Sequence, residues 1–284
     1  MAGSINANDG VKLAYEERGA SDGPAVLLLH GWSGSRKYFA PCMDMLAATC
    51  RVIAMDLRHH GDSGRPQHGF HVARLAADVN DLLTALDLKD VYVVGTSMGA
   101  AVIWSYIENY RTSRLGGAVF VDQAPLQNIA EDWRLGSKGC YDAASLSALR
   151  VKLSLNLRDC AVDTVKGCTS KQLPPTTEEM LIAETMKCDG IVLGNIMADH
   201  TQLDWRPILP TIDIPCLNLV GRLSGVFPWE GCAVVGNSIP DCKTVFFESC
   251  NHWLYIEEPK KFVDTLLKFL DPKLRVDMVH ESSV

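Results

Sequence analysis

The chain has 284 residues, of which 47% are hydrophobic and 21% are charged. These proportions are typical of a globular protein with a large buried core, and they exclude a disordered or fibrous chain. The formal net charge of −7 disfavours binding to nucleic acid or to an anionic membrane, because both repel an acidic protein. The first residues contain neither the basic nor the apolar stretch of a signal peptide, so we predict a cytoplasmic location.

Ten cysteines are many for a chain of this length. The sequence has no secretion signal and no Cys-x-x-Cys pair, so we expect free thiols that pack as small apolar side chains. A disulfide among the four cysteines of the middle region (Cys140, Cys160, Cys168 and Cys188) is an open alternative.

Strands and helices alternate in the first half of the chain. After the turn signal Asn8-Asp9-Gly10, apolar and polar residues alternate over 11–16, which predicts the second strand of a hairpin. Continuous apolar runs then predict strands that are buried on both faces, over 25–30, 51–56, 91–95 and 118–122. The stretches between and after them predict helices over 38–49, 75–86 and 97–110. This alternation predicts a parallel sheet with right-handed crossovers.

The alternation stops after residue 125. Residues 126–206 contain helical segments but no convincing buried strand, and the strand pattern resumes at 214–221 and 243–247 before a last helix over 259–270. We therefore predict an α/β fold with a mostly parallel sheet, helices on both faces and an inserted helical lid. The core would comprise 1–125 and 207–275, the lid 126–206, and a polar tail 276–284.

The sharpest motif is Gly95-Thr96-Ser97-Met98-Gly99, which follows a predicted strand and opens a predicted helix. This context is typical of a nucleophile elbow, where small residues allow a tight turn and the serine is held at its tip. We therefore expect Ser97 to be the nucleophile. The backbone N–H of Met98, at the start of the helix, would point into an oxyanion hole.

A second motif, His30-Gly31-Trp32, directly follows the first parallel strand. An oxyanion hole needs two donors, and the residue after His-Gly is placed to supply the second through its backbone N–H. We expect Trp32 to take this role and His30 to brace the loop.

The third motif is Ser249-Cys250-Asn251-His252-Trp253, just after the last predicted strand. In the order nucleophile, acid, histidine, only a histidine on this final loop can reach the elbow. We therefore predict that His252 is the general base.

These segments, together with Asp56 to Ser63, resemble the α/β-hydrolase superfamily, in its serine-nucleophile branch of non-haem chloroperoxidase-like and esterase-like proteins. The resemblance covers about residues 10–125 and 205–270. It implies acyl transfer through Ser97 without a metal or organic cofactor. The pair His59-His60 lacks the spacing of a zinc site.

The acid departs from the commonest pattern of this superfamily. Many members carry an aspartate three residues after the glycine that ends the seventh strand, and here that position, counted from Gly221, is Ser224. Some members place the acid after the sixth strand instead, which points to Asp122. Glu230 and Asp213 are weaker alternatives. Because a serine cannot carry the acid's charge, we expect Ser224→Ala to have little effect.

The expected function is hydrolysis of an ester or lactone of a small to medium apolar substrate. Substrate contacts are expected from Trp32, Trp205, His200 and Trp253. Two other reactions of the same triad stay open, perhydrolysis with apparent haloperoxidase activity and carbon–carbon bond hydrolysis, as does a ligand-binding protein without turnover. The expected partner is a small molecule, neither nucleic acid nor membrane, and a homodimer is left open. A dinucleotide enzyme is disfavoured, because no Gly-x-Gly-x-x-Gly follows the first buried strand.

Overall fold

The computed structural model describes residues 1–275 and residue 278. Within them, eight strands form one sheet in the order β1-β2-β4-β3-β5-β6-β7-β8. The strands are β1 (Ala2–Asn6), β2 (Lys12–Arg18), β3 (Ala25–Leu29), β4 (Arg51–Met55), β5 (Val91–Thr96), β6 (Leu115–Val121), β7 (Cys216–Gly221) and β8 (Cys242–Phe247). The hairpin β1–β2 is antiparallel and β2 pairs antiparallel with β4, whereas the pairs from β4 through β3 to β8 are parallel.

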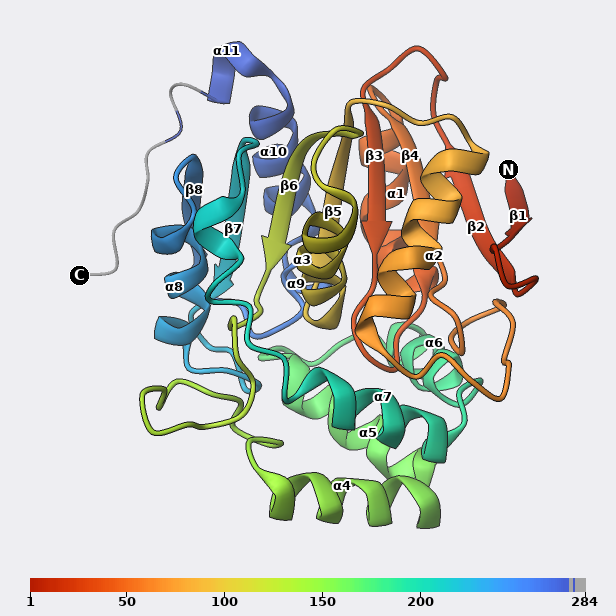
Figure 1. Cartoon of the computed structure of the whole chain (residues 1–284), viewed down its shortest axis with the longest axis vertical. Coiled ribbons are helices and arrows are strands. Elements are labelled where there is room, and N and C mark those ends of the chain that lie inside the picture. The colour runs from red at the N-terminus through yellow and green to blue at the C-terminus, as the bar shows by residue number, and fades with distance from the viewer. Residues whose placement is uncertain (276–277, 279–284) are drawn as a thin grey trace.

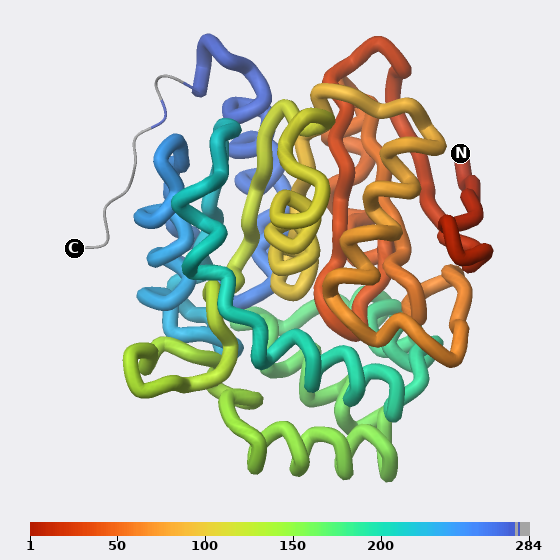
Figure 2. Tube along the Cα trace, in the orientation of Figure 1, coloured from red at the N-terminus to blue at the C-terminus, as the bar shows by residue number. Residues whose placement is uncertain are grey.

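Helices cover both faces of the sheet (Figure 1). On one face lie α2 (Val72–Ala85), α3 (Met98–Tyr110) and α8 (Trp229–Ser238), and on the other lie α1 (Ala40–Ala47), α9 (Leu254–Glu257) and α10 (Pro259–Leu270). The remaining short helices outside the lid are α11 (Pro272–Arg275) and the 3-10 turns η1 (Arg36–Phe39) and η2 (Leu209–Thr211). Figure 2 shows β1 and β8 at opposite edges of the sheet.

The lid is the segment between β6 and β7. Its helices are α4 (Ala143–Leu155), α5 (Leu157–Cys168), α6 (Pro175–Thr185) and α7 (Gly190–His200). They lie across the end of the sheet at which the parallel strands terminate (Figure 1). The predicted fold class is thereby confirmed. The predicted polar tail, 276–284, lies outside the described residues except for Met278.

Burial on both faces explains why the central strands could be read from the sequence. In β3, Leu27 and Leu29 belong to the core under α2 and α3, while Val26 and Leu28 belong to the core under α1 and α10. All four side chains are at most 1% exposed. Because successive strand residues point to opposite faces, such a strand must be apolar at every position.

The structure also differs from the sequence-based expectations. Strand β6 begins at Leu115, three residues before the predicted start. The prediction began too late because Gly116 and Gly117 interrupt the apolar run by which the strand was recognised. Helix α8 was not predicted, and it contains Gly231 and Gly236. A Cβ atom on Gly236 would lie 1.9 Å from the Thr244 hydroxyl of β8, so this glycine allows the helix to pack closely on the sheet.

Each of the ten cysteines carries a free thiol. Of the helices in the described part of the chain, none combines the length and the apolar character needed to cross a bilayer.

A buried ion pair anchors the loop after β4. Arg58 and Asp78 are both fully buried, and the Arg58 guanidinium donates two hydrogen bonds to the Asp78 carboxylate. A third guanidinium nitrogen donates to Asp9 at 3.0 Å. The pair ties this loop to α2, where Asp78 lies.

We predict that Asp78→Asn lowers the free energy of unfolding by about 3–5 kcal/mol, because it leaves the buried Arg58 charge poorly compensated. Urea unfolding followed by circular dichroism measures the change. The control is Asp264→Asn, which removes an exposed partner of Lys260 and should cost less than about 0.5 kcal/mol. Equal effects of the two substitutions would contradict the prediction.

Candidate active site

Ser97 is held in a strained turn between β5 and α3. Its backbone has φ 52° and ψ −125°, a conformation that non-glycine residues rarely adopt. The flanking glycines make the turn sterically possible. A Cβ atom on Gly95 would lie 2.4 Å from the Gly99 backbone, and one on Gly99 would lie 2.5 Å from the Leu29 carbonyl oxygen. The turn therefore presses against the end of β3.

The loop after β3 lies directly beside this turn. A Cβ atom on Gly31 would approach the Ser97 Cβ to 3.1 Å, so glycine allows Trp32 to follow close to the nucleophile. Met98 is the first residue of α3, and its N–H therefore has no acceptor within the helix. Of the two expected oxyanion donors, Met98 follows Ser97 directly in the chain, and Trp32 lines the same cavity as Ser97.

Two buried histidines brace this loop. His30 Nε2 accepts the Leu57 N–H at 3.0 Å, and its Nδ1 lies 2.7 Å from the Gly31 carbonyl oxygen. His60 Nε2 accepts the Ser33 N–H at 3.2 Å. Burial lowers the pKa of both imidazoles, which favours the neutral form that can accept these bonds. The expected bracing role of His30 agrees with these contacts.

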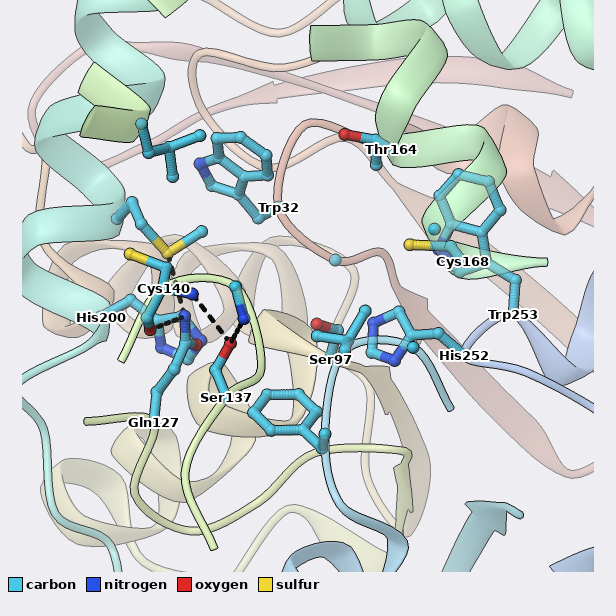
Figure 3. A pocket seen from close by; sticks show the side chains of 18 residues that line it. Trp32, Ser97, Gln127, Ser137, Cys140, Thr164, Cys168, His200, His252 and Trp253 are labelled. Atoms are coloured by element: carbon cyan, nitrogen blue, oxygen red, sulfur yellow. Dashed lines mark hydrogen bonds between the residues drawn. The ribbon is translucent and has the colours of Figure 1, made fainter. Parts of the chain in front are cut away.

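His252 lies on the loop between β8 and α9 and is 5% exposed. Its backbone N–H donates to Asn251 Oδ1 at 2.8 Å, and the same oxygen accepts the Gly225 N–H at 2.6 Å. Its Nδ1 is 2.6 Å from Asp122 Oδ2. With Nδ1 donating to this carboxylate, Nε2 is the nitrogen available towards the cavity that His252 and Ser97 both line (Figure 3).

Asp122 follows β6, the strand next to the nucleophile strand β5, and its side chain is fully buried. Its φ of 49° lies in the left-handed region, which aspartate tolerates better than most residues. Besides His252, its carboxylate accepts the Gly221 N–H at 2.9 Å and the Ser224 hydroxyl at 2.6 Å. The contact that the sequence predicted between Asp122 and His252 is therefore present.

Ser224 occupies the position at which the commonest pattern has the acid. It is 1% exposed, and its hydroxyl donates to the same Asp122 oxygen that faces His252. Its oxygen also lies 3.3 Å from the Phe227 N–H. Sequence reasoning missed this contact, because it treated Ser224 only as an absent acid. The expectation that Ser224 is dispensable is revised accordingly.

Trp32, Ser97 and His252 line a cavity of about 260 Å³. The cavity separates the elbow from the lid and receives side chains from both (Figure 3). Its wall comprises Gly31, Trp32, Ser97, Gln127, Ser137, Gly139, Cys140, Leu149, Thr164, Gly167, Cys168, Met197, His200, Gly225, Val226, Phe227, His252 and Trp253. Three of the expected substrate-contacting residues, Trp32, His200 and Trp253, are thus in position to meet a ligand.

The fourth, Trp205, does not line this cavity. Its ring is 5% exposed and lies 6.3 Å from that of Trp104, within the core under α2 and α3. The expectation that Trp205 contacts the substrate is therefore wrong for this cavity. An aromatic residue at the junction of lid and core can face either way, and here the ring of Trp205 packs beside that of Trp104 in the core. The weaker acid candidates are also elsewhere: Asp213 accepts the Thr112 hydroxyl, and Glu230 lies in the first turn of α8.

The sheet order, the inserted lid and the serine turn define an α/β hydrolase. A family model described as alpha/beta hydrolase fold matches residues 24–144. A non-heme chloroperoxidase from Streptomyces lividans is 33% identical over 276 residues, covering 94% of this chain and 99% of that protein. The chain therefore belongs to the α/β-hydrolase superfamily.

Solved structures agree with this assignment. An esterase from Exiguobacterium antarcticum superposes with a TM-score of 0.90 at 24% identity, over 95% of this chain and 99% of that one. An esterase from Rhodococcus sp. ECU1013 gives a TM-score of 0.81 at 25% identity, over 95% and 98%.

We predict that a fluorophosphonate probe labels Ser97 and that Asp122→Asn slows the labelling by about 10⁴-fold, the order of loss known when asparagine replaces a triad aspartate. Mass spectrometry of the labelled peptide identifies the serine and gives the rate. Glu230→Gln is the matched control and should label like the wild type. Labelling at an unchanged rate in Asp122→Asn would exclude Asp122 as the acid.

We further predict that Ser224→Ala slows the same labelling about tenfold, since a hydrogen bond to a charged group contributes about 1.5 kcal/mol. The matched control is Ser249→Ala, which changes an exposed serine of the His252 loop. Melting temperatures of both variants separate a loss of folding from a misplaced carboxylate. A folded Ser224→Ala protein that labels at the wild-type rate would show that Ser224 does not position Asp122.

Proposed function

We propose that this protein is a serine hydrolase that cleaves an ester or lactone of a small to medium, largely apolar substrate through an acyl-enzyme. The observation that carries the proposal is the bond between His252 Nδ1 and Asp122, on an imidazole that shares its cavity with the strained Ser97. A carboxylate at Nδ1 selects the tautomer whose Nε2 accepts a proton, as a general base must.

In the proposed reaction, His252 Nε2 takes the Ser97 hydroxyl proton as the serine oxygen bonds to the substrate carbonyl carbon. The backbone N–H groups of Trp32 and Met98 donate to the oxyanion that forms. The intermediate collapses, and the leaving alcohol departs with the proton from His252. Water then loses a proton to His252 and attacks the acyl carbon, which releases the acid and restores Ser97.

The cavity supports the proposed substrate size. A volume of about 260 Å³ is near the lower end for ligand pockets. Much of the wall is apolar, including Trp32, Leu149 and Phe227. An acyl or alcohol part of a few carbon atoms gains from burial against these side chains.

Perhydrolysis is the second candidate, and the similarity to a non-heme chloroperoxidase favours it. In that reaction hydrogen peroxide replaces water as the acceptor of the acyl group, so that the product is a peracid and Ser97 is restored in the same way. The ligand-binding alternative rested on the missing aspartate at position 224. The contact between Asp122 and His252 supports Asp122 as the acid in place of that aspartate, and so argues against this alternative.

We predict that the protein hydrolyses p-nitrophenyl esters of short and medium acyl chains and that Ser97→Ala abolishes this activity. The release of p-nitrophenolate, followed across the acyl series, gives the turnover and the preferred length. Adding hydrogen peroxide and assaying peracid distinguishes perhydrolysis from hydrolysis. Equal rates for the wild type and the Ser97→Ala protein would refute the proposed function.

A further inference from the structure

The residues that line the cavity limit the charge of the ligands it can bind. In the part of the chain that the structure describes, no Asp, Glu, Lys or Arg side chain lines it. A ligand that carries a net charge would therefore lose its hydration without gaining an opposite charge, which is costly. The cavity wall thus favours an uncharged ligand.

Three neutral polar side chains nevertheless gather on one side of this wall. Gln127, Ser137 and His200 are between 3% and 5% exposed. Figure 3 shows them together, on the side of the cavity away from Ser97 and His252. The loop after β6 contributes Gln127 and Ser137, and the last residue of α7 is His200. We call these three residues the polar subsite.

The surroundings of His200 decide which of its ring nitrogens can donate to a ligand. Among the described residues, its Nδ1 atom is buried and has no hydrogen-bond partner. Burial lowers the pKa of His200 to about 4, so the ring is neutral near pH 7. An enclosed N–H without an acceptor is rarer than a bare acceptor. The proton therefore belongs on Nε2, the ring nitrogen that remains for a bound molecule.

Ser137 offers a second donor. Ser137 Oγ accepts the N–H groups of Gly139 and Cys140, each at 3.2 Å, which leaves its hydroxyl hydrogen to donate. Gln127 Nε2 already donates to the Cys140 carbonyl oxygen at 3.4 Å and to Met197 Sδ at 3.3 Å, so it adds polarity to the subsite but no free donor. The Ser137 hydroxyl and the His200 Nε2–H can donate to the same kind of group.

We propose that the polar subsite binds an uncharged oxygen acceptor of the substrate, such as a ketone or ether oxygen, on the far side from the scissile carbonyl. The substrate class is then a neutral ester or lactone that bears a second oxygen function. This inference rests on the proposed hydrolase function. An all-carbon chain in the subsite would leave buried donors unpaired. A site with such donors therefore discriminates against a substrate that lacks the oxygen.

The test compares matched pairs of p-nitrophenyl esters. Each pair has an acyl chain of the same length, one saturated and one with a ketone near its end: pentanoate with 4-oxopentanoate, hexanoate with 5-oxohexanoate, and heptanoate with 6-oxoheptanoate. At the length that reaches the subsite, the wild type should prefer the oxo ester by about tenfold in kcat/KM, the effect of one well-formed hydrogen bond. The anionic monoester of succinic acid should be a poor substrate.

The variants His200→Phe and Ser137→Ala should lower this preference towards one. Because the readout is a ratio within one protein, a general loss of activity cancels. His68→Phe is the matched control, since His68 is exposed and does not line the cavity. The subsite proposal is overturned if the wild type prefers no oxo ester at any length, or if both variants keep the preference.

Binding of the same pairs to the Ser97→Ala protein, measured by calorimetry, separates this proposal from the proposed function. Tighter binding of an oxo ester, together with no turnover by the wild type, would refute the hydrolase and support the subsite. Turnover without any difference in binding or rate within the pairs would support the hydrolase and refute the subsite.

Discussion

The geometry of the site depends on one strained turn. Ser97 has a positive φ, and a residue in such a conformation costs of order 1–3 kcal/mol unless its surroundings enforce it. Here the surroundings are backbone: the turn contacts the end of β3, and β3 pairs with β5 in the register Leu29 with Gly95. Because both strands are buried between two helical layers, the sheet supplies the free energy that holds the serine in place.

Asp122, the proposed acid, follows the strand beside this turn. Asp122 follows β6, which lies between β5 and β7, so its carboxylate reaches His252 from within the sheet. The loop after β7 still contributes, but as a source of donors, through Gly221 N–H and the Ser224 hydroxyl. A buried carboxylate with three donors is well compensated. The same arrangement explains how a serine can stand where many relatives have aspartate.

Local patterns predicted those parts of the structure that burial alone determines. The apolar runs of β3, β4 and β5, the elbow at Ser97 and the position of His252 all follow from strand burial and chain order. Tertiary partners determine the rest. The side of the junction that Trp205 faces depends on Trp104. Gly236 of α8 depends on contact with β8, and the hydrogen bond between Ser224 and Asp122 joins residues far apart in the chain. Such partners leave no periodic signal in a single sequence.

Trp32 joins the loop after β3 to the lid. Its backbone follows Gly31 beside Ser97, whereas its indole Nε1 donates to the Leu193 carbonyl oxygen of α7 at 2.9 Å. The ring also packs against the cluster of Leu153, Cys160, Cys188 and Leu193 at the centre of the lid. An outward displacement of α7 would have to break this hydrogen bond. One side chain therefore ties the position of the lid to the position of the loop that lies beside Ser97.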